Sequence, residues 1–246
     1  MLRLHINVDH VATVRNARGT AYPDPIEAAR MCLEAGAHGI TAHLREDRRH
    51  IRDEDVHRLR ATLRATFNLE MASTDEMIAI ACTVVPDVVT LVPERREERT
   101  TEGGLEVAKA TPALRAHVEQ LRAADIKVSL FIAPDLAQIE ASHALGVEQI
   151  ELHTGEYAHA AGDADAEKRE LERLTTAARR GRELGLEIAA GHGLTTKNVP
   201  ALVAIPEIVE LNIGHAMVAD AIFVGLPAAV RAMLAAIGKG RGELAR

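Results

Sequence analysis

Short apolar runs rich in β-branched residues alternate along the chain with longer segments of helical periodicity. Such runs, bounded by turn residues, predict the strands of a buried sheet. The predicted strands read RLHINV, GITAHL, NLEM, DVVTLV, KVSLFI, QIELHT, EIAAGH and IVELNIG. Between and after them, the predicted helices read DPIEAARMCLEAGA, DEDVHRLRATLRA, TDEMIAIACTVV, PALRAHVEQLRAAD, DLAQIEASHALG, AEKRELERLTTAARRGRELG, VPALVAI and VGLPAAVRAMLAAIG.

Strand and helix alternate eight times in 246 residues, which predicts a single (β/α)8 TIM barrel domain spanning residues 1–246. A doubly wound open sheet has the same alternation, because periodicity alone does not show closure. We favour the barrel because polar residues stand at one end of nearly every strand, and a closed barrel gathers such residues round one mouth. These residues are Asn7, Asp9, His10, His43, Arg45, Glu70, Glu151, His153, His192, Asn212 and His215.

The composition narrows the class of partner. Hydrophobic residues make up 47% of the chain and aromatic residues only 2%, which predicts an aliphatic core. The net charge of −7 argues against nucleic acid and against anionic membrane, since both attract basic proteins, and favours small-molecule partners.

Cys32 and Cys82 lie in apolar helical segments, as reduced thiols of a cytosolic protein do. The longest apolar run is too short to span a bilayer. We therefore expect a soluble cytoplasmic protein.

Single polar residues at strand ends are often structural, but several of them together are costly to bury unless they bind a ligand. After the second strand, HLREDRRHI places His43 and Arg45 on one side of the strand. One of these two side chains can act as a base while the other holds an anion.

The segments AAGHGLTT and ELNIGHA follow the last two predicted strands and carry glycine turns that lead into helices. In many barrels these two loops bind phosphate, since backbone N–H groups approach an anion closely where side chains are absent. Arg18, in the loop predicted after the first strand, can supply a counter-charge. The long charged segment LVPERREERTTEGGL after the fourth strand has the length of a closing lid.

Two absences limit the chemistry. No lysine ends a predicted strand, which disfavours an aldolase that forms a Schiff base through its own lysine. No Gly-x-Gly-x-x-Gly stands in the first turn, which disfavours a nicotinamide site. A metal-dependent sugar isomerase or hydrolase remains an alternative, with His43, Glu70, His153 and His192 as ligands. A non-catalytic assembly module is a further alternative, disfavoured by the many polar strand ends.

Nine motifs, in this order and spacing, carry a family resemblance that runs from the first strand to the last helix. They read NVDHVATVRNARGTAYPDP, HLREDRRHI, NLEMA, LVPE, TTEGGL, VSLFI, HTGEYA, AGHGLT and ELNIGHA. The chain closely resembles the pyridoxine 5′-phosphate synthases of the deoxyxylulose-phosphate-dependent vitamin B6 pathway. The resemblance implies a (β/α)8 barrel with additional helices, assembled as a homo-octamer. It also implies a transferase-type, ring-closing synthase that uses no metal or organic cofactor. This synthase condenses 3-amino-2-oxopropyl phosphate with 1-deoxy-D-xylulose 5-phosphate to give pyridoxine 5′-phosphate, phosphate and water.

The resemblance also implies residue roles. His43 and Glu70 become proton acceptors, His192 a proton donor, and Glu151 the residue that stabilises a cationic transition state. The residues that resemble contacts to the aminooxopropyl phosphate are Asn7, Arg18, Gly193, Gly214 and His215. Those that resemble contacts to the deoxyxylulose phosphate are Asp9, His10, Arg45, His50 and Thr100. The chain departs from the family pattern in AHAAGDADAEKR and in GKGRGELAR, which affects loop length and C-terminal packing.

Overall fold

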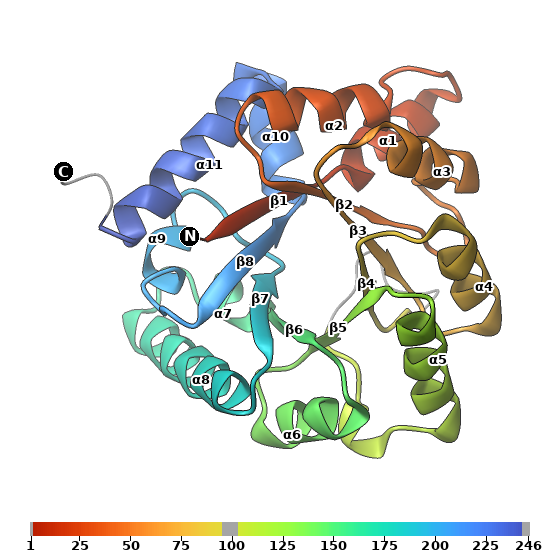
Figure 1. Ribbon diagram of the computed structural model, residues 1–246. Coiled ribbons are helices and arrows are strands. Elements are labelled where there is room, and N and C mark those ends of the chain that lie inside the picture. Colours follow the sequence, from red (N-terminus) through yellow and green to blue (C-terminus); the bar gives the residue numbers. More distant parts are fainter. Residues whose placement is uncertain (1, 95–102, 243–246) are drawn as a thin grey trace.

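The sheet of the protein closes on itself: each strand pairs in parallel with the next, and β8 returns to pair with β1 (Figure 1). The computed structural model describes residues 2–94 and 103–242. Its strands are β1 (Arg3–Asn7), β2 (Gly39–His43), β3 (Thr66–Met71), β4 (Val88–Leu91), β5 (Lys127–Ile132), β6 (Gln149–His153), β7 (Glu187–Gly191) and β8 (Ile208–Ile213). This closure confirms the predicted (β/α)8 barrel and excludes the open doubly wound sheet.

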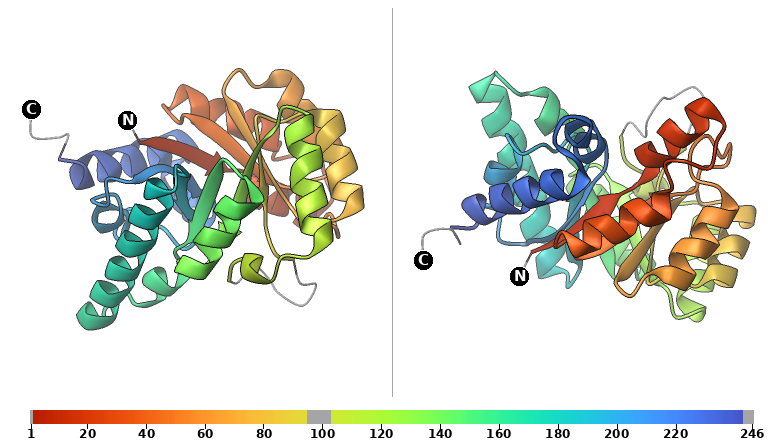
Figure 2. Two further views of the ribbon diagram at one scale, coloured as in Figure 1. Left: turned by 60° about the horizontal axis from the view of Figure 1, so that its bottom comes forward. Right: turned by 90° about the horizontal axis from the view of Figure 1, so that it is seen from above.

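Helices surround the barrel, as Figures 1 and 2 show from three directions. Those that follow the predicted helical segments are α2 (Pro25–Glu34), α3 (Asp53–Thr62), α4 (Asp75–Val84), α5 (Pro112–Ala123), α6 (Leu136–Leu145), α8 (Ala164–Glu183), α9 (Val199–Leu202) and α11 (Leu226–Gly240). Capping residues define where two of these helices begin. The Asp24 side chain caps the N-terminus of α2 and the Thr111 side chain caps that of α5, and a proline follows each cap. No helix within residues 2–94 and 103–242 is long and apolar enough to cross a bilayer.

Three further helices follow strands directly: α1 (Asp9–Arg18), α7 (Gly155–His159) and α10 (His215–Val224). A 3-10 helix, η1 (Val107–Lys109), precedes α5. The residues after β1 therefore form a helix, where the sequence pattern predicted a loop. The helix α1 begins at the acidic residue Asp9 and is capped at its C-terminus by Gly19, whose φ of 68° is the left-handed conformation that glycine adopts easily. These elements confirm the additional helices expected from the family resemblance.

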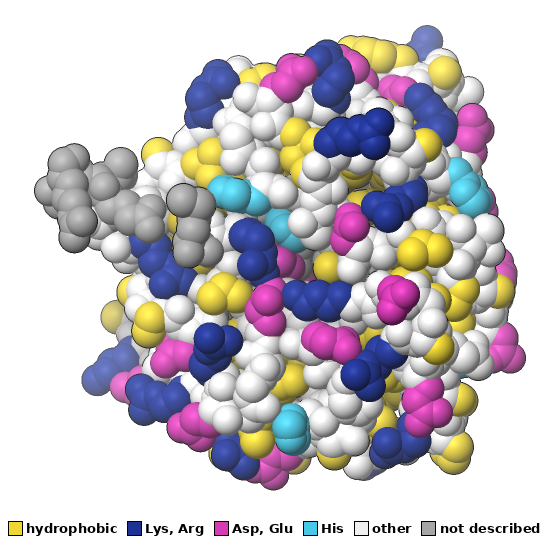
Figure 3. Space-filling model, viewed as in Figure 1, with side chains coloured by type: hydrophobic (Ala, Val, Ile, Leu, Met, Phe, Trp, Pro, Cys, Tyr) yellow, Lys and Arg dark blue, Asp and Glu magenta, His cyan; other side chains and the backbone are white. Residues whose placement is uncertain are grey.

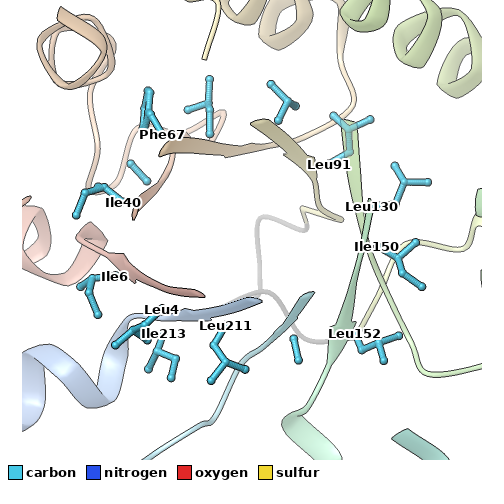
Figure 4. Packing of buried hydrophobic residues seen from close by; sticks show 14 of the residues in the cluster. Leu4, Ile6, Ile40, Phe67, Leu91, Leu130, Ile150, Leu152, Leu211 and Ile213 are labelled. Atoms are coloured by element: carbon cyan, nitrogen blue, oxygen red, sulfur yellow. The ribbon is translucent and has the colours of Figure 1, made fainter. Parts of the chain in front are cut away.

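Alternation along each strand sends apolar side chains outward, toward the helices. Figure 4 shows these side chains outside the ring of strands; those labelled are Leu4, Ile6, Ile40, Phe67, Leu91, Leu130, Ile150, Leu152, Leu211 and Ile213. All of them are buried. At roughly 1.5–3 kcal/mol for each large aliphatic side chain removed from water, this layer between barrel and helices holds the fold together.

The alternate strand positions place polar side chains within the barrel, where many TIM barrels carry branched aliphatic residues. The buried members are His5, Thr41, His43, Asn68, Thr90, Ser129, Gln149, Glu151, Glu210 and Asn212. Several bond across the interior: Thr41 donates to Asn212 over 2.8 Å, and Gln149 donates to Glu210 over 3.1 Å. The interior is therefore a polar column that leads up to the ends of the strands.

The starts of several strands are tied together by charged side chains. Arg3 Nε donates to Glu210 over 3.0 Å, and Lys127 Nζ lies 2.8 Å from Glu187. Arg3 also contacts Glu187.

Basic and acidic side chains are interspersed over the face shown in Figure 3, with no broad area of one sign.

Candidate active site

A cavity of about 690 Å³ lies at the C-terminal ends of the strands. It is lined by most of the site residues predicted from the sequence: Asn7, Asp9, His10, His43, Arg45, His50, Glu70, Glu151, His192, Gly193, Gly214 and His215. Arg18 does not line the cavity and is exposed at the end of α1. Thr100, with most of the predicted lid, lies outside the described residues. Residues far apart in the sequence thus meet in one space, as a barrel requires.

His43, the last residue of β2, lies between two carboxyl groups. Its Nε2 is 2.8 Å from Oε1 of Glu94, and its Nδ1 is 3.9 Å from Oε2 of Glu70. Its backbone N–H donates to Oδ1 of Asp9 over 2.8 Å, which ties the end of β2 to the start of α1. Glu94 and Glu70 therefore flank the imidazole while Asp9 holds the backbone, and only 7% of the His43 side chain is exposed.

The pKa values of the two carboxyl groups beside His43 are shifted in opposite directions. Burial raises the pKa of Glu70 well above its usual value, and the negative charges of Glu151 and Asp9 raise it further. Burial also acts to raise the pKa of Glu94, but the hydrogen bond and charge of His43, the Glu46 N–H and Arg45 together lower it. Pairs of groups whose pKa values are pushed apart are typical of acid–base sites.

Glu151, from β6, points across the barrel toward β8. Its Oε2 accepts a 2.7 Å hydrogen bond from Nδ2 of Asn212. A Cβ at Gly191 on β7 would lie 2.3 Å from its Oε1, so the glycine leaves room for the carboxyl group. Burial raises the pKa of Glu151 to about 8, and the charge of Glu210 adds to the rise while the Asn212 hydrogen bond opposes it. A cation placed beside this group would favour its ionised form.

His192 follows β7 with a backbone φ of 86°, a conformation rare for residues with a side chain. The Thr154 hydroxyl lies 2.6 Å from the His192 carbonyl oxygen and 2.7 Å from that of Gly191, and donates to this turn. The ring of His153 packs against His192 at a centroid distance of 4.9 Å. Burial lowers the pKa of His153 to about 4, and nearby His192 adds to the effect. His153 is therefore neutral at physiological pH, while His192 reaches the cavity.

Two histidines face each other at the starts of α1 and α10. Nδ1 of His10 is 3.1 Å from Nδ1 of His215. The first residue of α10 is His215, and unpaired N–H groups at a helix start attract anions. A Cβ at Gly214 would come within 3.0 Å of the Asn7 side chain, so glycine keeps this approach open. Imidazoles beside a helix N-terminus suit a phosphate group.

Arg15 and Arg45 are both buried, but Arg15 makes a structural contact whereas Arg45 lines the cavity. Arg15 is buried and forms a bidentate ion pair with Asp55, each bond 2.7 Å long, and also donates to the His50 carbonyl. This contact fixes α1 against the segment that carries His50. Arg45, only 3% exposed, lines the cavity together with His50. Burial lowers the pKa of His50, although the charge of Asp9 acts in the opposite direction.

Asp9, His43 and Glu70 offer ligand atoms within 4.8 Å of one another, close enough to surround a metal ion. The Asp9 oxygens, however, already accept hydrogen bonds from the His43 N–H over 2.8 Å and from Asn7 Nδ2 over 2.9 Å. Burial and nearby negative charges raise the pKa of Glu70, so a metal would have to compete with a proton for this carboxyl group. The donor set therefore suits proton transfer better than a resident cation.

The chain matches the family model described as Pyridoxal phosphate biosynthesis protein PdxJ over residues 4–239. The chain belongs to this family. The pyridoxine 5′-phosphate synthase of Xanthobacter autotrophicus is 56% identical over 245 residues, covering 99% of this chain and 95% of that protein. That of Syntrophotalea carbinolica is 54% identical over 238 residues, covering 97% and 99%. These relatives confirm the family resemblance carried by the motifs: the chain is an enzyme of vitamin B6 biosynthesis.

Solved structures of low sequence identity resemble this PdxJ chain in fold, and they support the fold alone. The thiamine phosphate pyrophosphorylase of Pyrococcus furiosus superposes with a TM-score of 0.62 at 15% identity, covering 97% of this chain and 96% of that one. The phosphoribosyl anthranilate isomerase of Thermus thermophilus gives a TM-score of 0.60 at 13% identity, covering 96% and 98%.

Sequence reasoning did not identify two residues that hold predicted site residues of this PdxJ chain. Glu94 contacts His43, and Thr154 holds the turn at His192. Glu94 stands shortly after β4, near the position where other strands carry polar residues, and that position was the available signal. Thr154 lies between β6 and α7, and no sequence pattern marks it. Its role becomes visible only in the structure, through its contact with the strained backbone of His192.

Proposed function

We propose that this PdxJ enzyme condenses 3-amino-2-oxopropyl phosphate with 1-deoxy-D-xylulose 5-phosphate to form pyridoxine 5′-phosphate, phosphate and water. One observation carries the proposal: His43, Glu70, Glu151 and His192, brought by different strands, line a single cavity. The names of the relatives support the product. Building a pyridine ring from two open chains needs several proton transfers, and these residues supply acids and bases within one space.

The amine of the aminooxopropyl phosphate attacks the ketone of the deoxyxylulose phosphate and forms a Schiff base with loss of water. The substrate therefore provides the nitrogen that an aldolase takes from its own lysine. Lys127, at the start of β5, pairs instead with Glu187 at the opposite end of the strands from the cavity. The protein's part is to hold the two substrates together and to move protons.

His43 and Glu70 are the proposed proton acceptors. They stand opposite each other in the register of β2 and β3, so both reach the same side of a bound substrate. The raised pKa of Glu70 makes it, once deprotonated, a stronger base than an exposed carboxylate. His43 remains in contact with the Glu94 carboxylate, which stabilises it after it has taken a proton.

His192 is the proposed donor that protonates a leaving oxygen, and Glu151 stabilises the positive charge of the iminium intermediates. Glu151 is buried, so its charge acts with little screening by water. Because its pKa is about 8 before a cation arrives, we expect cation binding to release its proton.

In this proposal the two phosphates occupy neighbouring parts of the cavity. Contacts to the aminooxopropyl phosphate come from Asn7, Gly193, Gly214 and His215, which line the cavity, and from Arg18, which is exposed at the end of α1. Contacts to the deoxyxylulose phosphate come from Asp9, His10, Arg45, His50 and Thr100. The facing pair of His10 and His215 supports two neighbouring sites, because one lies in each set. Two dianions need positive charge in an acidic protein, and imidazoles that gain protons on binding provide it.

A metal-dependent isomerase is the alternative that one observation favours, namely the proximity of Asp9, His43 and Glu70. His153 and His192, the other ligands considered for it, pack against each other beside β6 and β7. An enzyme of this kind loses activity on chelation, whereas the proposed synthase does not.

We also propose that the enzyme assembles as a homo-octamer in the cytoplasm. An apolar patch supports self-association: at the end of α10, Ile222 is 74% exposed, Phe223 87% and Val224 60%. Contiguous exposed apolar residues typically mark an interface. Phe223→Asp should yield smaller species in light scattering, while Leu136→Asp, at an exposed position on another helix, should not. A monomeric native protein would contradict the assembly.

The test of the proposed function is a product assay with purified protein treated with a chelator. With both phosphorylated substrates present, we expect pyridoxine 5′-phosphate, followed by its absorbance, and equal amounts of inorganic phosphate. Either substrate alone should give neither product. Absence of pyridoxine 5′-phosphate, together with isomerisation of a sugar phosphate that requires a divalent metal, would favour the isomerase-type alternative.

A further inference from the structure

Glu94 is a buried carboxylate that has no proton-transfer or substrate-binding role in the proposed reaction. Its side chain is 5% exposed, although it follows β4 in a loop rather than lying within the barrel. Oε1 lies 2.8 Å from Nε2 of His43, and Oε2 accepts the backbone N–H of Glu46 over 3.1 Å. Both oxygens are therefore engaged, and the backbone contact fixes the orientation of the carboxylate toward His43.

A carboxylate in this position can only accept a hydrogen bond. The pKa of Glu94 lies below its usual value despite burial, so the group is ionised at neutral pH. Nε2 of His43 must therefore carry the hydrogen in this contact. In a neutral imidazole the other ring nitrogen then holds the lone pair. That nitrogen is Nδ1, which lies 3.9 Å from Oε2 of Glu70. Both residues line the cavity.

We propose that Glu94 is a positioning residue that fixes the tautomer of His43, so that Nδ1 is the atom that takes a proton from the substrate. The inference deepens the proposed function and rests on it, because it assigns the base of that reaction to one nitrogen. The proton passes from a substrate carbon to Nδ1, and the new imidazolium keeps its Nε2–H on Glu94. Asp9 contributes separately by holding the backbone of His43.

The other groups around His43 cannot replace Glu94 in this role. Glu70 approaches Nδ1 rather than Nε2, at a distance of 3.9 Å. The His50 ring lies 6.0 Å away between centroids, at an interplanar angle of 62°. Arg45 is a donor and offers no acceptor to Nε2–H. Among the described residues, the contact that orients the ring through Nε2 is that of Glu94.

The test compares Glu94→Gln and Glu94→Asp with the native enzyme, with Glu119→Gln on the exposed face of α5 as a control. Circular dichroism checks that each variant folds. In the native protein without substrates, 15N spectra of labelled histidine should show His43 with hydrogen on Nε2. In Glu94→Gln we expect a tautomer mixture and a kcat lower by about 10- to 100-fold, with little change in KM. Glu94→Asp should recover part of both.

The spectrum of the substrate-free enzyme keeps this inference separate from the proposed function. An Nδ1–H tautomer in the native protein, or an unchanged tautomer and kcat in Glu94→Gln, would overturn the role of Glu94. Absence of synthase activity in the native enzyme would instead overturn the proposed function. A Glu94→Gln effect confined to KM would also contradict the inference, since it would indicate a substrate contact.

Discussion

Asn212 donates a 2.7 Å hydrogen bond to the buried side chain of Glu151. Asn212 is therefore an uncharged partner of a carboxyl group whose pKa is about 8. An amide satisfies the carboxyl oxygen without neutralising a charge. The pair therefore leaves Glu151 able to respond to a cation, whereas an arginine in place of Asn212 would keep it permanently ionised.

Glu151 makes stability depend on pH. In the unfolded chain it titrates near its ordinary pKa of 4.5, and in the fold at about 8. Between these values the folded protein binds the extra proton, so this contribution to stability is lost as pH rises. We expect Glu151→Gln to gain stability relative to the native protein between about pH 5 and about pH 8.5, measured by urea unfolding. A difference between the two proteins that stays constant over this range would contradict the shifted pKa of Glu151.

Thr154 should matter for catalysis through His192. Thr154→Val keeps the shape of the side chain but removes the hydroxyl that donates to the strained turn. We expect kcat to fall roughly 10- to 100-fold, because small displacements of a reacting group are costly. Thr154→Ser should retain most activity. Thr176→Val, which removes a hydroxyl bonded to a backbone carbonyl on α8, is the matched control. Equal activity in both valine variants would refute the link.

His43→Ala and Glu70→Gln test the two proposed bases. Each variant should fold, since the apolar layer outside the barrel is untouched, and each should lose about 10²–10⁴-fold in kcat. Steady-state kinetics with circular dichroism as a folding check measures this. Full activity in both variants would remove these residues from the mechanism.

Ionic strength tests the phosphate contacts. Added salt screens the attraction between the dianionic substrates and the histidines and arginines of the cavity, so both KM values should rise. The kcat should change less, because the buried groups that move protons are screened weakly. KM values that do not respond to salt would show that charge is not what holds the phosphates.

The strands could be predicted from the sequence because each combines β-branched residues with a turn at its end. The helix α1 could not, because Asp9 and His10 open it with polar residues directly after β1 and its start resembles a loop. The polar column within the barrel was also not anticipated. Gln149 and Asn68 look like surface positions of a strand until closure turns them inward.

The site was predictable where a residue ends a strand, since parallel strands bring their ends to one mouth. His43 ends β2, Glu70 stands one residue before the end of β3, and Glu151 stands two residues before the end of β6. Arg18 depends on how the end of α1 is oriented, and strand positions carry no information on that. Glu94 was missed because its contact with His43 depends on the conformation of the loop after β4, which the sequence pattern does not determine.

The most direct test of the shared cavity is a crystal structure of the slow variant Glu70→Gln soaked with both phosphorylated substrates. The account predicts one joined adduct in the cavity, its nitrogen facing Glu151 and its carbon skeleton beside Nδ1 of His43. Substrates bound at two separate places, or an adduct remote from both residues, would contradict it.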